Sequence, residues 1–139
     1  MRYLLDTNII SELRKKQPDK EVIKWFKEIN PSQLFVSCIT IGEIKIGALK
    51  KFKKDKVAGD ALLKWVENIT KEYVEQVLVV DLETCEEWAN LLLIDSTNSI
   101  DSLIAAQAIQ SNMTLVTRNT KHFDMFSVKL LNPFEQDRS

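Results

Sequence analysis

Short, continuous apolar runs alternate along this chain with stretches of helical periodicity. Neighbouring residues of a strand point to opposite faces of a sheet, so a continuous apolar run indicates a strand that is covered on both faces. Alternation of such strands with helices is typical of a parallel sheet inside two helical layers. We predict an α/β fold, a three-layer α/β/α sandwich around a parallel sheet of four to five strands, in a single domain spanning residues 1–139. The expected strands are Tyr3–Leu5, Leu34–Ser37, Val77–Val80, the run ending in Leu115–Thr117, and Val128–Leu131.

Helical periodicity fills the segments between these runs. Helices outnumber strands, so at least one connection must contain two helices, and Lys20–Asn30 and Ala58–Tyr73 are the candidates for the extra ones. The other expected helices begin near Ile9, at Thr40, at Thr84 and at Ser99, and the Thr40 helix is expected to run into a lysine-rich turn at residues 50–56.

Composition excludes several classes of protein. The net charge of −1 gives no global attraction to nucleic acid or to a membrane surface, so any basic binding surface must be local. Cys38 and Cys85 lack a metal-ligand spacing, and their apolar surroundings predict buried free thiols in a reducing compartment. No apolar stretch has the length of a signal peptide or a membrane span, which favours a cytoplasmic protein.

Three carboxylates occupy equivalent places in the alternation. Asp6 follows the first strand, Glu43 is expected in the first turn of the helix after the second, and Asp101 in the first turn of the helix before the fourth. Each has a purely structural explanation when taken alone. Asp6 is a suitable N-cap. Glu43 with Thr40 matches a capping box, and Asp101 behind Ser99 suits the helix dipole.

Taken together, the three carboxylates favour a metal site. The carboxyl ends of parallel strands share one edge of the sheet, where open α/β sheets bind their ligands. Unit charges about 5 Å apart repel by roughly 3 kcal/mol per pair at an effective dielectric near 20, which capping at about 1 kcal/mol each does not offset. Oxygen ligands without histidine or cysteine suit Mg²⁺ or Mn²⁺. Past the fourth strand, Asn119 offers a neutral oxygen ligand and Thr117 a group to hold water, or both simply form a strand-end turn. We interpret His122, the only histidine, as a loop residue rather than a catalytic base.

Four segments resemble, in order, the motifs of PIN-domain proteins, in particular toxins of the VapC and FitB type. They are Leu5–Glu12, Ile39–Ile44, Asp101–Ala108, and Val116–Asn119 together with His122-Phe123 and Asn132–Phe134. The resemblance implies a metal-dependent ribonuclease whose ligands are Asp6, Glu43 and Asp101. Many relatives have an aspartate in the place of Asn119, which we include among the catalytic residues.

The resemblance also implies partners. Family members pair with a small antitoxin, bind DNA only indirectly through it, and commonly form homodimers. One or two Mg²⁺ ions would polarise a phosphodiester oxygen and activate water. In-line attack would then leave 5′-phosphate and 3′-hydroxyl ends, as the resemblance implies. We predict substrate contacts from Asn8, Lys50, Thr117 and Arg118. Lys50 lies seven residues after Glu43, on the same helix face and about 10 Å away, although a solvated basic helix end explains the local lysines equally well.

Three other functions remain as alternatives. A haloacid-dehalogenase-like phosphotransferase also has an aspartate after its first strand, but it needs a second acid where Asn8 stands. A signalling receiver domain needs an acidic pair before its phosphorylated aspartate, and Arg2-Tyr3-Leu4 does not supply one. A degenerate PIN-like module that only binds RNA or a partner protein has no such conflict, and metal-dependent RNA cleavage distinguishes it from the enzyme.

Overall fold

A computed structural model of the protein describes residues 1–135 and contains one sheet of five parallel strands. The spatial order is β3-β2-β1-β4-β5, so β1 lies at the centre. The strands are short, and their bounds are β1 Tyr3–Leu5, β2 Leu34–Ser37, β3 Val77–Leu78, β4 Thr114–Val116 and β5 Leu130–Leu131. The predicted sheet is therefore confirmed.

Two helices connect each of the first three pairs of strands along the chain. They are α1 Thr7–Arg14 and α2 Lys20–Glu28, α3 Cys38–Lys54 and α4 Lys56–Glu72, and α5 Leu82–Ile94 and α6 Ser99–Gln110. Both predicted extra helices are present, and the third crossover contains a further pair. Asp, Ser or Asn caps every one of these helices, because its side-chain oxygen accepts a hydrogen bond from a first-turn amide.

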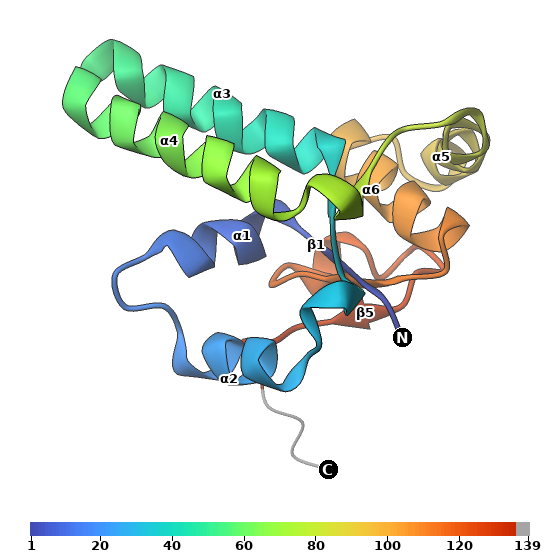
Figure 1. Cartoon of the computed structure of the whole chain (residues 1–139). Helices are drawn as coiled ribbons and strands as arrows, with labels where there is room; N and C mark the ends of the chain where they lie inside the picture. The colour runs from blue at the N-terminus through green and yellow to red at the C-terminus, as the bar shows by residue number, and fades with distance from the viewer. Residues whose placement is uncertain (136–139) are drawn as a thin grey trace.

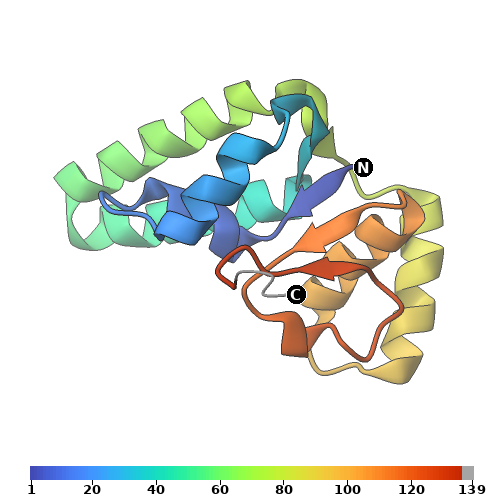
Figure 2. The same cartoon turned by 90° about the horizontal axis from the view of Figure 1, so that it is seen from below.

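The two faces of the sheet lead into two separate hydrophobic cores. In β1, Leu5 faces the core built with α1, α3 and α4, whereas its neighbour Leu4 faces the core built with α5 and α6. Leu5 is in register with Val36 and Val116, so three adjacent strands present their apolar side chains to the same layer. Figures 1 and 2 show the α3–α4 hairpin on one side of the sheet and the α5–α6 pair on the other.

Several boundaries differ from the sequence-based prediction. α3 begins at Cys38, two residues before Thr40, because Ser37 at the end of β2 accepts a bond from the amide of Ile39 and caps the helix. α3 also continues to Lys54, so the expected lysine-rich turn is the helix end itself, and only Asp55 separates it from α4. The third and fifth strands are two residues long rather than four.

A buried glutamine ties the edge of the sheet to the helical layer. The Gln107 amide nitrogen donates to the carbonyls of Leu78 and Val79, at 3.2 and 3.3 Å, and its oxygen accepts from the Ser37 hydroxyl. Beyond Leu78 the backbone therefore bonds to a side chain of α6 instead of a neighbouring strand. This replacement explains why β3 ends before Val80.

The two cysteines are free thiols, as predicted, although both are half-buried rather than buried. Within residues 1–135, none of the helices combines the length and the apolar character that crossing a bilayer requires.

Gly59 permits the close packing of α3 on α4. A Cβ at this position would lie 2.2 Å from the backbone Cα of Phe52, which cannot move without breaking the hairpin. We expect Gly59→Ala to lower the free energy of unfolding by about 3 kcal/mol. Gly42→Ala is the matched control, since nothing lies within 4 Å of a Cβ there and it should raise stability by about 0.5–1 kcal/mol. Chemical denaturation of both variants measures the difference, and equal stabilities would contradict the close approach.

Candidate active site

Asp6 stands directly after the central strand β1, and its carboxylate is buried, with 6% exposure. It caps α1, as the local sequence predicts, because Oδ1 accepts a 2.8 Å bond from the amide of Thr7. Oδ2 accepts from the Thr117 hydroxyl at 2.9 Å and from the Asn8 amide group at 3.3 Å. Asp6 is therefore held in one orientation from two strands of the sheet.

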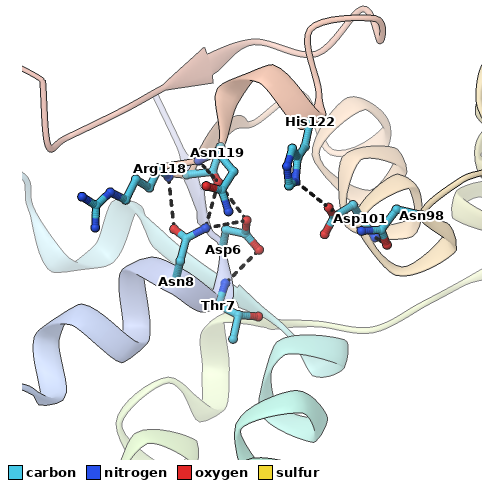
Figure 3. A network of polar contacts seen from close by, with 9 residues as sticks. Asp6, Thr7, Asn8, Asn98, Asp101, Arg118, Asn119 and His122 are labelled. Carbon is cyan, nitrogen blue, oxygen red and sulfur yellow. Dashed lines mark hydrogen bonds and ion pairs between the residues drawn. The ribbon is translucent and has the colours of Figure 1, made fainter.

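The Thr117 hydroxyl is the centre of this network. Its oxygen accepts from Asn8 Nδ2 at 3.2 Å and from the Asn119 amide at 3.1 Å, which uses both of its lone pairs. Its proton therefore points to Asp6. Asn8 Oδ1 accepts from the Arg118 amide at 3.1 Å, so the loop after β4 is fastened to the start of α1 (Figure 3). Figure 3 also shows the Asn119 side chain beside Asp6.

Glu43 lies in the second turn of α3, not the first, because the helix begins at Cys38. The predicted capping box with Thr40 is therefore wrong: Thr40 is inside the helix, and its buried hydroxyl has no hydrogen-bond partner among the described residues. Glu43 Oε1 instead accepts a 2.7 Å bond from the Thr7 hydroxyl. Thr7 thus links Glu43 to the neighbour of Asp6.

Asp101 lies in the first turn of α6, as predicted, but the cap is Asn98 rather than Ser99. Asn98 both accepts from the Asp101 amide and donates to Asp101 Oδ2, at 3.2 and 2.9 Å. His122 Nδ1 lies 3.5 Å from the same carboxylate oxygen, in a short 3-10 helix, Thr120–His122 (Figure 3). His122 therefore contacts a predicted ligand and is not an isolated loop residue.

The charges of Glu43 and Asp101 act on Asp6, although the three carboxylates do not close around a common point. Burial raises the pKa of Asp6 above its ordinary 3.8, and the charges of Asp101 and Glu43 raise it further, although bonds from Thr117 and Thr7 oppose the shift. Within residues 1–135, no three Asp, Glu, His or Cys side chains lie close enough to hold one ion. The side chains are turned to partners of their own: Glu43 to Thr7, and Asp101 to Asn98 and His122.

The donor chemistry of the site nevertheless fits a hard cation. Glu43 Oε2 and Asp101 Oδ1 make no hydrogen bond among the described residues, and all three side chains supply carboxylate oxygens. Burial, the largest cause of the raised pKa of Asp6, and the charges of Asp101 and Glu43 all disfavour the ionised carboxylate, which a cation would stabilise.

Two basic residues predicted to contact substrate lie in different surroundings. Arg118 is exposed, and its guanidinium lies 4.5 Å from the centroid of the Phe134 ring. A cation–π contact therefore orients the Arg118 side chain toward Phe134. Lys50 is exposed on α3, whereas Lys51 lines the groove that reaches Glu43. Contacts of Lys50 and Arg118 with substrate stay predictions.

Sequence reasoning missed three positioning residues, namely Thr7, Asn98 and His122. Thr7 was visible only as a capping type beside Asp6, because its partner Glu43 is 36 positions away. Asn98 had a local signal, since it stands three residues before Asp101 at capping distance. His122 belongs to the fourth segment that resembles the family, but its contact with Asp101 depends on where the segment after β4 crosses α6.

The fold and these side chains define a class of protein. A parallel sheet with acidic residues gathered after β1 and β2 and at the start of α6 is the arrangement of the PIN domain, and the chain belongs to this family, whose sequence model matches residues 3–127.

Particular relatives cover nearly the whole chain. It is 30% identical over 139 residues to VapC ribonuclease Y4jK of Sinorhizobium fredii, an alignment covering 95% of this chain and 97% of the relative. It is also 30% identical to toxin FitB of Neisseria gonorrhoeae, with 94% and 97% covered. The crystal structure of FitAcB from the same organism superimposes with a TM-score of 0.87 at 27% identity, covering 96% of this chain and 99% of that one.

Proposed function

We propose that the protein is a metal-dependent ribonuclease of the toxin type, restrained by a small antitoxin in the cytoplasm. The observation that carries the proposal is the buried Asp6 carboxylate, whose pKa is raised by burial and by the charges of Asp101 and Glu43. Such a cluster is costly to leave unneutralised and is characteristic of functional sites. The names of the ribonuclease and toxin relatives support RNA as the substrate and an antitoxin as the partner.

Asp6, Glu43 and Asp101 would hold Mg²⁺ or Mn²⁺, with Asn119 as a neutral oxygen beside them. When bound there, the metal supplies a Lewis acid for the phosphodiester and lowers the pKa of water. The protein supplies orientation. Thr117 and the Thr7 amide hold Asp6, and the Thr7 hydroxyl holds Glu43.

On the opposite side of the site, Asn98 and His122 orient Asp101. His122 is 59% exposed, so its ring remains open to substrate and solvent while it contacts the carboxylate. The sheet and its two cores keep these groups on rigid elements, which is what positioning of a phosphodiester for in-line attack demands.

Incubation of purified protein with single-stranded RNA tests this function. We expect cleavage with Mg²⁺ or Mn²⁺, none after the metal is removed with EDTA, and recovery when Mn²⁺ is restored. End-group analysis should find 5′-phosphate and 3′-hydroxyl products. RNA binding without cleavage in any divalent metal would instead support the alternative, a degenerate PIN module that only binds.

A further inference from the structure

A groove of about 340 Å³ leads away from the site between α1 and α3, with α4 beneath it. We call it the α1–α3 groove. Its lining includes Thr7 and Arg14 of α1, Glu43, Gly47 and Lys51 of α3, and Trp65 of α4. It begins at the two site residues Thr7 and Glu43, which are hydrogen-bonded to each other. The groove is therefore continuous with the reaction site.

The far end of the groove has a different chemistry from the near end. Lys51 follows Glu43 by eight positions in α3, which places the lysine about 12 Å farther along the helix axis. Arg14 and Lys51 are exposed, and neither forms a salt bridge within residues 1–135. The Arg14 guanidinium lies 6.0 Å from the ring centroid of the half-buried Trp65. The groove is therefore acidic at Glu43 and has two cationic side chains and an aromatic ring at its other end.

The middle of the groove is open because position 47 is a glycine. A Cβ there would meet nothing within 4 Å, so neither close packing nor backbone conformation requires the residue. Glycine inside a helix is unfavourable, and here it leaves the path from Glu43 to Lys51 unobstructed. A ligand can therefore lie along the groove from Glu43 to Lys51 without meeting a side chain at position 47.

We propose that the α1–α3 groove binds the single-stranded RNA that flanks the scissile phosphate. In this arrangement a base stacks on Trp65, and Arg14 and Lys51 contact the intervening phosphates. Aromatic faces combined with a cationic path are how proteins hold single strands without reading their sequence. The Arg14–Trp65 contact is at the outer limit of a cation–π interaction, so an incoming base displaces it and frees the guanidinium for phosphate. The inference rests on the proposed ribonuclease function.

Gly47→Trp is the sharpest test, because Gly47 is exposed beside the groove and a tryptophan at this position fills it. Its matched control is Gly42→Trp, in the same helix and equally open, but outside the groove. Affinity is measured by fluorescence anisotropy with a labelled single-stranded RNA of about 12 nucleotides, in EDTA so that no cleavage occurs. We expect Gly47→Trp to weaken binding at least about tenfold, and Gly42→Trp to change it less than about twofold.

Two further variants test the chemistry of the far end. Trp65→Ala should raise the RNA dissociation constant about tenfold, whereas Trp65→Phe should retain most of the affinity because a base can still stack. Lys51→Ala should reduce the slope of log affinity against log salt by about one, as expected for the loss of one phosphate contact. Circular dichroism establishes that each variant is folded before its affinity is compared.

Equal RNA affinity in Gly47→Trp and Gly42→Trp would overturn the proposal. Failure of the proposed function gives a different result. Wild-type protein that binds RNA through the groove, yet cleaves none in any divalent metal, would overturn the nuclease and leave the groove assignment intact. Binding in EDTA and cleavage in Mg²⁺ therefore test the two proposals separately.

Discussion

Asp6→Asn is expected to lower kcat/KM for RNA at least about 10³-fold, equivalent to about 4 kcal/mol of transition-state stabilisation. The amide keeps the size of the side chain but removes the charge that interacts with those of Glu43 and Asp101. Steady-state cleavage of a fluorogenic RNA measures the loss. Asp60→Asn is the matched control, because Asp60 is an exposed partner of Lys64 outside the site. A decrease of less than about tenfold in Asp6→Asn would remove Asp6 from the catalytic set.

The same substitution should change how stability depends on pH. The pKa of Asp6 is raised in the folded protein, so the folded state binds the proton more tightly than the unfolded chain. Its contribution to stability is therefore greatest at low pH and is lost as pH rises from 3.8 through the higher folded value. In EDTA, the melting temperature of Asp6→Asn relative to wild type should accordingly rise between about pH 4 and about pH 7. A relative melting temperature that stays constant or falls would contradict the raised pKa.

Sequence patterns were sufficient to predict the layers because a strand that is buried on both faces needs apolar residues at consecutive positions. Leu4 and Leu5 are adjacent yet belong to different cores, and only a doubly covered strand requires both to be apolar. The same argument placed Asp6 at the sheet edge. Periodicity also identified the two-helix connections, since α2 and α4 each have a continuous apolar stripe.

Boundaries were less predictable because competing hydrogen bonds decide where an element begins or ends. Thr40 and Glu43 match a capping box, but Ser37 caps α3 earlier, at the end of a strand whose length the sheet sets. Val80 is apolar, yet the backbone at Val79 bonds to Gln107 of α6 rather than to another strand. At β3 a tertiary hydrogen bond overrides the local preference, whereas at α3 a second local cap, the Ser37 hydroxyl, starts the helix earlier than the capping box predicts.

The places of the three acids in the fold were predictable, whereas most of the contacts that hold them were not. Asp6, Glu43 and Asp101 can be placed because each follows or precedes a strand. Thr7 and His122 support two of these acids through contacts made far along the sequence. Such contacts depend on which segments the fold brings together, so composition and residue spacing alone do not predict them.

Thr117→Val is expected to produce the largest combined effect on stability and activity among the residues behind Asp6. Valine matches the shape of threonine, but without the hydroxyl Asp6 Oδ2 loses a donor and the Asn119 amide loses its acceptor. Unsatisfied buried groups cost about 1–3 kcal/mol each, so we expect a loss of roughly 3 kcal/mol and a melting temperature about 9 °C lower. Cleavage should fall about 10²-fold, because Asp6 is no longer fixed. Thermal denaturation and RNA cleavage measure the two effects.

Two matched variants show whether the hydroxyl is the cause. Thr117→Ser keeps the donor and both lone pairs, so it should restore most of the activity. Thr114→Val makes the same change at the other end of β4, where the hydroxyl has only a 3.7 Å contact with the Met1 sulfur, and it should be nearly neutral. The Thr117 bond also lowers the pKa of Asp6, so its loss should raise that pKa further and make Thr117→Val more destabilising near pH 7 than near about pH 4. If Thr117→Val and Thr114→Val behave alike, the directional bond from Thr117 does not hold the carboxylate, and burial alone must position it.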